Sequence, residues 1–179
     1  MEKRVVFYKG KPDSAPEPPL LPDGYESLFW RPSLTAICPP GFGFYPFLVW
    51  WLLHVLHVFQ NREYGVFVIR RDNKWVHRSV VTPRFYRFPF MNSRDLQVGD
   101  VWTAEHERGN SLASFALLSI LRDEPIRNRT YWYLVDEDNT ASIRIAERAN
   151  FGTAAIGTRT APCGVRFFGK YQIREQLHD

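Results

Sequence analysis

The segment formed by residues 95–121 constrains the fold more than any other, because it joins the signals of a strand, a polar loop and a helix. Valine and tryptophan favour an extended strand that ends near Thr103, and residues 105–110 form a charged turn. The apolar residues that follow recur at helical spacing: Leu112, Phe115, Ala116 and Ile120. The loop therefore lies at a helix N-terminus, where unpaired N–H groups and a positive dipole favour a phosphate-bearing ligand beside Arg108.

This loop resembles the pyrophosphate-binding motif of the GNAT superfamily of N-acetyltransferases, which follows a strand and reads R/Q-x-x-G-x-G/A. Six consecutive residues fill the six positions: Arg108, Gly109, Asn110, Ser111, Leu112 and Ala113. Ser111 stands where glycine is usual, so its side chain narrows the approach of a pyrophosphate while its hydroxyl adds a donor. From the residues alone, a capped and buried helix without a ligand explains the pattern as well.

A second stretch, residues 131–151, resembles the next strand and helix of the same superfamily, where an N-x-x-A/S-I segment ends in Gly-Phe. Three residues match that segment: Asn139, Ser142 and Ile143. Phe151 closes it, and Asn150 replaces the glycine, which asparagine can do because it tolerates the left-handed conformation at a helix C-terminus. The two motifs cover roughly the second half of the chain.

The resemblance implies an α/β (α+β) fold with a central mixed, mostly antiparallel sheet, a V-shaped splay between two strands and flanking helices. We expect one domain over residues 1–179, because this length buries one core well and two poorly. Hydrophobic residues make up 45% and aromatic residues 16%, which indicates a globular core and leaves aromatic side chains for a pocket or an interface.

Other segments carry local signals of their own. Residues 82–94 hold two prolines and four aromatic residues and are expected to continue extended, as a wall of the acceptor site or as core filling. Alternating apolar residues around a short polar turn predict a hairpin, and further apolar runs predict a first strand and two closing strands. The expected ranges are a strand at 5–8, a proline-rich loop at 11–24, a hairpin of 63–70 with 74–81, and strands at 152–160 and 165–173.

The most apolar run, residues 42–59, is short for a membrane span. Gly43 and Pro46 limit a helix to a start near Phe47 and a length of about 13–14 residues, and His54 and His57 place two polar rings on one face. We expect this helix to pack on the sheet, with membrane-surface or partner docking as the alternative. The histidine pair has no third ligand at a recognisable spacing, so no metal site is predicted.

The net charge of +4 and the pI near 9.2 fit an anionic ligand, but the basic residues are scattered, which argues against nucleic acid. Cys38 and Cys163 are far apart and lack zinc-binding spacing, which favours a reducing, cytoplasmic setting. The first residues lead directly into a strand-like segment, so no secretory signal is expected.

The resemblance further implies that acetyl-CoA is the cosubstrate and that no metal takes part. Its pantetheine arm is expected in the splay near Trp102 and Thr103, bonded to free backbone groups, and its diphosphate on the amides of residues 109–113. Asn139 is expected to reach the pantetheine, with Ser142 beside it. Backbone N–H groups of the motif strand are expected to polarise the thioester carbonyl.

In this superfamily the acetyl group commonly passes directly to a neutral amine, which requires a base and an acid. Many relatives use a tyrosine of the second motif's helix as the acid; Ala146 occupies that position, so Tyr133 is the remaining candidate, with packing as its alternative role. His77 is the predicted base, because imidazole titrates near neutral pH, and Asp100 and Glu105 are the other candidates. A structural histidine explains position 77 equally well.

Residues 88–109 resemble acetyltransferases encoded with polysaccharide pathways, which suggests a nucleotide-linked amino sugar as acceptor. Three arginines are candidates for its diphosphate: Arg31, Arg84 and Arg87. The alternatives are a protein, peptide or small amine as acceptor, and a non-catalytic acyl-CoA-binding or membrane-associated interaction domain. The expected partners are a small-molecule amine, which includes a nucleotide sugar, and a second copy in a homodimer; neither nucleic acid nor a membrane is expected.

Overall fold

The computed structural model describes residues 3–122, 129–160 and 169–177, and within these ranges eight strands form one open sheet of order β2-β3-β4-β5-β6-β1-β7-β8. Every neighbouring pair is antiparallel except β5 and β6, which are parallel. The predicted mixed, mostly antiparallel sheet is confirmed. The strands are β1 (Lys3–Gly10), β2 (Tyr25–Trp30), β3 (Gly65–Arg71), β4 (Lys74–Pro83), β5 (Leu96–Thr103), β6 (Tyr131–Asp136), β7 (Gly152–Arg159) and β8 (Tyr171–Gln176).

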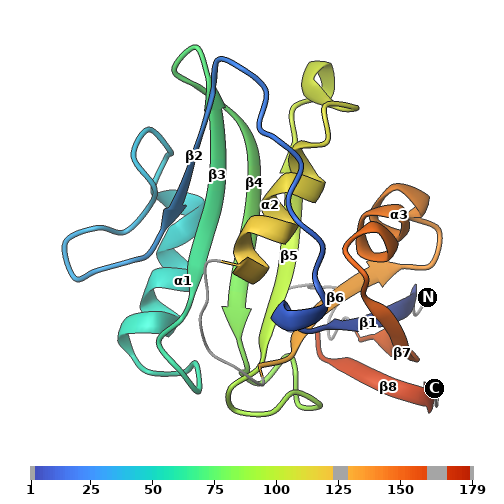
Figure 1. Cartoon of the computed structure of the whole chain (residues 1–179). Helices are drawn as coiled ribbons and strands as arrows, with labels where there is room; N and C mark the ends of the chain where they lie inside the picture. The colour runs from blue at the N-terminus through green and yellow to red at the C-terminus, as the bar shows by residue number, and fades with distance from the viewer. Residues whose placement is uncertain (1–2, 123–128, 161–168, 178–179) are drawn as a thin grey trace.

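Helices cover both faces of the sheet. Figure 1 shows α2 (Leu112–Arg122) and α3 (Thr140–Arg148) on one face and α1 (Tyr45–Val55) on the other. Because side chains alternate along a strand, β3 contributes Phe67 to the core on the α2 face and Val66 to the core on the α1 face. Two short 3-10 turns, Pro12–Ser14 and Glu105–Glu107, complete the helical elements described.

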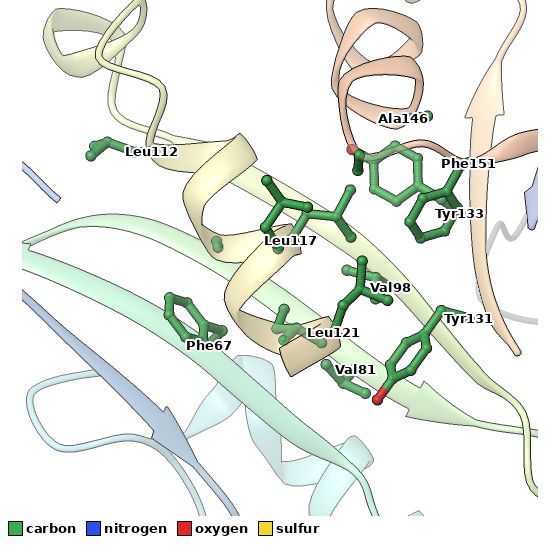
Figure 2. Close-up of a cluster of buried hydrophobic side chains, with 14 of the residues drawn as sticks. Phe67, Val81, Val98, Leu112, Leu117, Leu121, Tyr131, Tyr133, Ala146 and Phe151 are labelled. Carbon is green, nitrogen blue, oxygen red and sulfur yellow. The ribbon is translucent and has the colours of Figure 1, made fainter. Parts of the chain in front are cut away.

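The core between α2 and the sheet fixes the position of the predicted loop. Figure 2 shows Leu117 and Leu121 of α2 directed toward Val98 of β5 and Val81 of β4. All four side chains are buried, and burial of a leucine contributes about 1.5–3 kcal/mol. These contacts hold α2 against β4 and β5, and with it the loop that precedes the helix.

Helix α1 packs on the sheet as predicted, with Phe47 buried in the core of that face, but its bounds differ from the expectation. It begins at Tyr45, before Pro46. A proline is tolerated there because the N–H groups of the first turn have no partner within the helix, so the missing N–H costs no helical hydrogen bond. It ends at Val55, and His57 beyond it has a left-handed φ of 57°. The prediction that His54 and His57 share one helix face was therefore wrong.

Among the described residues, no helix combines the length and the apolar character needed to cross a lipid bilayer.

The predicted hairpin is confirmed as β3 and β4, joined by Asp72 and Asn73 with φ values of 50° and 61°. Positive φ at both central residues is the geometry of a tight two-residue turn that matches strand twist. Beyond Pro83 the chain turns rather than continuing extended, so that expectation for residues 82–94 was wrong. Phe85 and Phe88 in this segment fill the core on the α1 face.

The two ends of the chain meet in one half of the sheet. β1 is paired on both sides, with β6 and with β7, so the N-terminal strand lies inside the sheet. β8 spans Tyr171–Gln176, later than the predicted strand at 165–173, whose first residues lie outside the described ranges. The edge strand β2 follows the proline-rich loop and was not predicted.

The parallel strands β5 and β6 separate after a short contact. They are paired at three positions, Leu96 with Tyr131, Gln97 with Trp132 and Val98 with Tyr133. β5 then continues to Thr103 and β6 to Asp136 without pairing to each other. The predicted V-shaped splay is thus present, and no strand of the described ranges pairs with the β6-facing backbone edge of β5 after Val98.

Candidate active site

A β-bulge in β5 lies where the splay begins. Val80 of β4 is paired with Gly99, but Arg78 is paired with Trp102, so β5 has one extra residue at this point. Asp100 within the bulge has a left-handed φ of 46°. The bulge interrupts the alternation of side chains, so that Gly99 and Asp100 line one cavity and residues 101–103 line another.

The first cavity, named here the α2–α3 cavity, has a volume of about 490 Å³ and lies between the end of β5, the loop before α2 and helix α3. It brings both sequence motifs together in space. It is lined by Val101, Trp102, Thr103, Glu107, Arg108, Gly109, Ser111, Leu112, Ala113, Ser114, Asn139, Ala141, Ile145 and Arg148. All but two of the predicted cofactor-binding residues are in this set; the exceptions are Asn110 and Ser142.

The loop before α2 presents backbone donors to this cavity. The first hydrogen bond of the helix runs from Phe115 N to Ser111 O, 2.9 Å apart, so the amides at positions 112–114 have no partner within the helix. Gly109 and Ser111 both have positive φ, 95° and 58°. Position 111 therefore favours glycine for its backbone, a reason that the sequence alone did not reveal, and serine holds it at a cost of about 1–2 kcal/mol.

The buried side chain of Glu107 anchors this loop through hydrogen bonds. Its carboxylate is buried and accepts hydrogen bonds from Tyr25 Oη at 2.5 Å, Asn110 Nδ2 at 3.0 Å and Arg71 Nη1 at 3.5 Å. The hydrogen bond from Tyr25 is the largest of the effects that lower the pKa of Glu107. Asn110 thus supports the loop, and the edge strand β2 is tied to it through Tyr25.

Asn139 begins α3 as its N-cap. Its Oδ1 accepts a hydrogen bond from Ser142 N at 3.1 Å, which leaves only Nδ2 to donate to a ligand in the α2–α3 cavity. Ser142 does not line this cavity, and burial raises the pKa of Tyr133. Figure 2 shows Tyr133 beside Phe151 and below Ala146. Tyr133 lines neither cavity, so its role as acid stays a prediction that this placement does not favour.

His77 is fully buried between β4 and β5. Its Nδ1 lies 2.8 Å from Thr103 Oγ1 and its Nε2 lies 2.9 Å from Ser79 Oγ. Burial lowers the pKa of His77 to about 4, so the ring is neutral near pH 7. Because both ring nitrogens are engaged, the ring offers none to a substrate, and this placement argues against the predicted role as general base.

The second cavity, named here the α1-face cavity, lies on the opposite face of the sheet and has a volume of about 340 Å³. Its walls come from α1, from the turns after β4 and from the strands on both sides of the splay. It is lined by Trp50, Val80, Thr82, Arg87, Phe88, Gln97, Gly99, Asp100, Arg159 and Tyr171. Of the aromatic residues at 82–94, Phe88 lines this cavity, and distant segments add Trp50 and Tyr171; that this wall belongs to an acceptor site stays a prediction.

Of the three candidate bases, only Asp100 reaches a cavity. Its side chain is 59% exposed and forms an ion pair with Arg78, with Nη2 and Oδ2 3.1 Å apart. Glu105 is exposed in the 3-10 turn beyond β5 and lines neither cavity. Asp100 is thus the candidate base that the structure places beside the splay.

The three candidate arginines separate in the same way. Arg87 lines the α1-face cavity, whereas Arg84 donates to Pro89 O at 3.2 Å and Arg31 lies over the Phe29 ring. Sequence reasoning missed Arg148 in the α2–α3 cavity and Arg159 in the α1-face cavity. A basic residue in the last turn of the second motif's helix was the available signal for Arg148; nothing local marked Arg159.

Within the described ranges, no group of three histidine, cysteine, aspartate or glutamate side chains is placed to hold a metal ion. Cys38 donates to Phe42 O at 3.3 Å, and Cys163 lies outside these ranges.

Comparison with known proteins identifies this fold through structure. No family model and no curated sequence matches the chain. Solved structures do match: a tandem GNAT protein of the clavulanic acid biosynthesis pathway (15% identity, 85% of this chain and 50% of that one, TM-score 0.59), a GCN5-related N-acetyltransferase from Sphaerobacter thermophilus (17%, 88% and 50%, 0.58) and a GNAT-family acetyltransferase from Novosphingobium aromaticivorans (14%, 87% and 62%, 0.55).

These likenesses establish the fold as that of the GCN5-related N-acetyltransferases, the GNAT superfamily. The chain spans about half to three fifths of the length of the three structures. Their names describe acetyl transfer by those proteins, and at these identities the fold alone is shared.

Proposed function

We propose that this chain is an N-acyltransferase that holds acetyl-CoA in the α2–α3 cavity and transfers its acetyl group to a primary amine in the α1-face cavity. The observation that carries the proposal is the row of amides at positions 112–114, which have no partner within α2 and line a cavity that continues along the edge of β5 beyond its pairing with β6. Such a helix N-terminus suits a diphosphate, and such a strand edge suits the amides of pantetheine.

Each part of the site has a defined task in this proposal. Arg108 and Arg148 add positive charge beside the amides, and the Asn139 Nδ2 group donates to the pantetheine. The cosubstrate supplies the thioester. A β5 N–H group at the bulge, where the backbone turns out of the regular ladder, donates to the oxygen of that thioester as charge develops on it.

Asp100 is the proposed base. It lies at the start of the splay on the α1 face, where a bound amine meets the gap between β5 and β6, and it accepts the amine proton directly or through a water molecule. α3 has Ala146, without a hydroxyl, and Tyr133 is buried, so the leaving thiolate takes its proton from solvent in this scheme. Positioning of the two substrates then supplies most of the rate.

The acceptor in this proposal is a small molecule. The α1-face cavity is bounded by α1, by the turns after β4 and by β8, and its volume of about 340 Å³ is at the small end of ligand sites. A nucleotide-linked amino sugar remains a candidate acceptor from the sequence resemblance, and free amino sugars and amino acids are the smaller candidates.

Calorimetric titration with coenzyme A, followed by a thiol-release assay with acetyl-CoA and a panel of amines, tests the proposal. We expect Arg108→Ala to weaken coenzyme A binding about tenfold, the effect of one charge-assisted contact. Arg144→Ala is the matched control, because Arg144 is exposed on α3 and outside the cavity. Failure of the wild-type protein to bind coenzyme A refutes the cofactor site; tight binding without turnover of any amine favours a non-catalytic acyl-CoA-binding domain.

A further inference from the structure

We propose that the α1-face cavity selects an acceptor that carries an anionic group, a carboxylate or a phosphate, at a distance from its amine, and that Arg87 and Arg159 bind this group. The inference rests on the proposed function and names the substrate class of the same site. It is carried by the convergence of two guanidinium groups on one aromatic side chain inside a cavity.

The two arginines come from segments far apart in the sequence. Arg87 lies in the turns after β4, and Arg159 is the last residue of β7. Both guanidinium carbons lie 5.7 Å from the centroid of the Tyr171 ring at the start of β8. Both residues line the cavity together with Tyr171. The fold thus gathers two positive charges at one place, which costs electrostatic energy unless an anion joins them.

The hydrogen bonds of these groups leave donors free for a ligand. Arg87 uses Nε to donate to Gly169 O at 3.2 Å, and Arg159 uses one Nη1 group to donate to Tyr171 Oη at 3.2 Å. In the parts of the chain that the structure describes, neither guanidinium forms an ion pair with a carboxylate. Since each guanidinium has five N–H donors, donors remain that match the oxygens of a carboxylate or a phosphate.

The charge on Arg87 is partly desolvated. Burial is the largest cause of a lowered pKa at Arg87, and the positive charge of Arg159 lowers it further. A guanidinium keeps its proton even so, so the cavity holds a charged group that has lost part of its water. A bound anion would compensate for both the lost water and the repulsion between the two arginines.

The opposite side of the same cavity is suited to the amine. Asp100 and Gly99 of β5 line it there, beside the splay. Asp100 belongs to β5 and Arg159 to β7, which lie on opposite sides of the splay in the sheet order, and Arg87 meets Arg159 at the Tyr171 ring, so the acid and the two arginines approach the cavity from different strands. Trp50 and Phe88 supply apolar wall between them, which suits the body of an amino sugar or a short carbon chain.

Pairs of amines that differ only in the anion test this inference. We would compare glucosamine 6-phosphate with glucosamine and β-alanine with its amide, measuring both kcat/KM and calorimetric binding in the presence of coenzyme A. A preference of at least tenfold for the charged member of a pair supports the inference, and the preferred pair distinguishes phosphate from carboxylate. Equal use or equal binding of charged and neutral members overturns it.

Variants locate the effect. Arg87→Gln and Arg159→Gln are expected to lower kcat/KM and affinity for the charged amine by about ten- to a hundredfold, the range for a lost hydrogen bond to a charged group, while the neutral amine is unaffected. Arg84→Gln is the matched control, because Arg84 is in the same turns but outside the cavity. Arg159→Lys, which retains the charge, serves if a glutamine variant fails to fold, and it should keep part of the preference.

The two proposals fail in different ways. Absence of coenzyme A binding rejects the proposed function, whereas turnover of amines with no dependence on Arg87, Arg159 or the anion rejects only this inference. Equal losses for charged and neutral amines also reject it, because they indicate a structural role for the arginines.

Discussion

Removal of the Tyr25 hydroxyl tests how the edge strand β2 supports the loop before α2. In Tyr25→Phe, Glu107 loses its 2.5 Å hydrogen bond but keeps Asn110 Nδ2 at 3.0 Å and Arg71 Nη1 at 3.5 Å. These two groups lose their bonds to Tyr25 Oη, at 3.2 and 3.1 Å, but retain the carboxylate as acceptor. A hydrogen bond to a charged group contributes about 1.5–3 kcal/mol. Because two partners remain and Tyr25 is partly exposed to water, we expect a loss near the lower limit, about 1.5 kcal/mol of unfolding free energy.

Urea unfolding followed by circular dichroism measures this loss, and calorimetry measures coenzyme A binding to the same variant. The control is Tyr45→Phe, since Tyr45 is 78% exposed at the start of α1 and should change neither quantity. A second arm, Glu107→Gln, makes the Tyr25 hydrogen bond neutral, so adding Tyr25→Phe to it should cost less than in the wild type. Equal costs in both backgrounds, or an unchanged stability of Tyr25→Phe, would refute the network.

Three further predictions concern the core, the loop and pH. Leu117→Ala leaves a cavity between α2 and the sheet and is expected to lower the unfolding free energy, measured in urea, by about 2–5 kcal/mol. The control Leu20→Ala, at a 95% exposed site, should lower it by less than about 0.5 kcal/mol, and similar losses for the two variants would contradict the packing. Ser111→Val is expected to reduce stability and coenzyme A affinity, because β-branched residues strongly disfavour φ near 58°. Ser111→Gly should instead raise the unfolding free energy by up to about 1–2 kcal/mol, and a neutral valine would argue against that conformation. Between pH 6.5 and about 4, His77 binds a proton in the unfolded chain but not in the folded protein. The unfolding free energy should therefore fall by up to about 3 kcal/mol as the pH drops through this interval. His77→Gln should lack this part of the pH dependence, and an identical pH profile for the variant would refute the prediction.

The sequence predicted those parts of the fold whose signals lie within one short stretch of residues. In residues 95–121, the turn residues that bound the strand and the helix and the apolar spacing of both elements lie within one stretch of sequence. In the β3–β4 hairpin, both strands adjoin the turn that connects them. The edge strand β2 was missed because its pattern is short and half exposed, and its pairing with β3 depends on residues some forty positions later. The place of β1 between β6 and β7 is likewise fixed by distant partners.

In the candidate site, too, the sequence predicted the residues that belong to local motifs and missed those that distant segments bring together. The loop of Arg108 to Ala113 and the cap Asn139 meet in one cavity, because each belongs to a motif with its own local signature. The α1-face cavity is assembled from α1, from the turns after β4 and from β7 and β8, so Arg159 carried no local signal. His77 has the right chemistry for a base, but its burial between β4 and β5 follows from strand register, which composition does not reveal.

The β5 bulge explains how one strand serves two sites. Gly99 and Asp100 are consecutive residues that both line the α1-face cavity, and the next three residues line the α2–α3 cavity. A regular strand would alternate its side chains between the two faces. The extra residue thus separates the proposed acceptor side from the proposed cofactor side at the point where β5 leaves β6.

A crystal structure of the protein with bound coenzyme A tests the central claim most directly. The account predicts diphosphate oxygens within hydrogen-bond distance of the amides at positions 112–114, and a pantetheine arm along β5 with its thiol at the splay near Gly99. Coenzyme A bound outside the α2–α3 cavity, or a diphosphate that does not contact these amides, would contradict it.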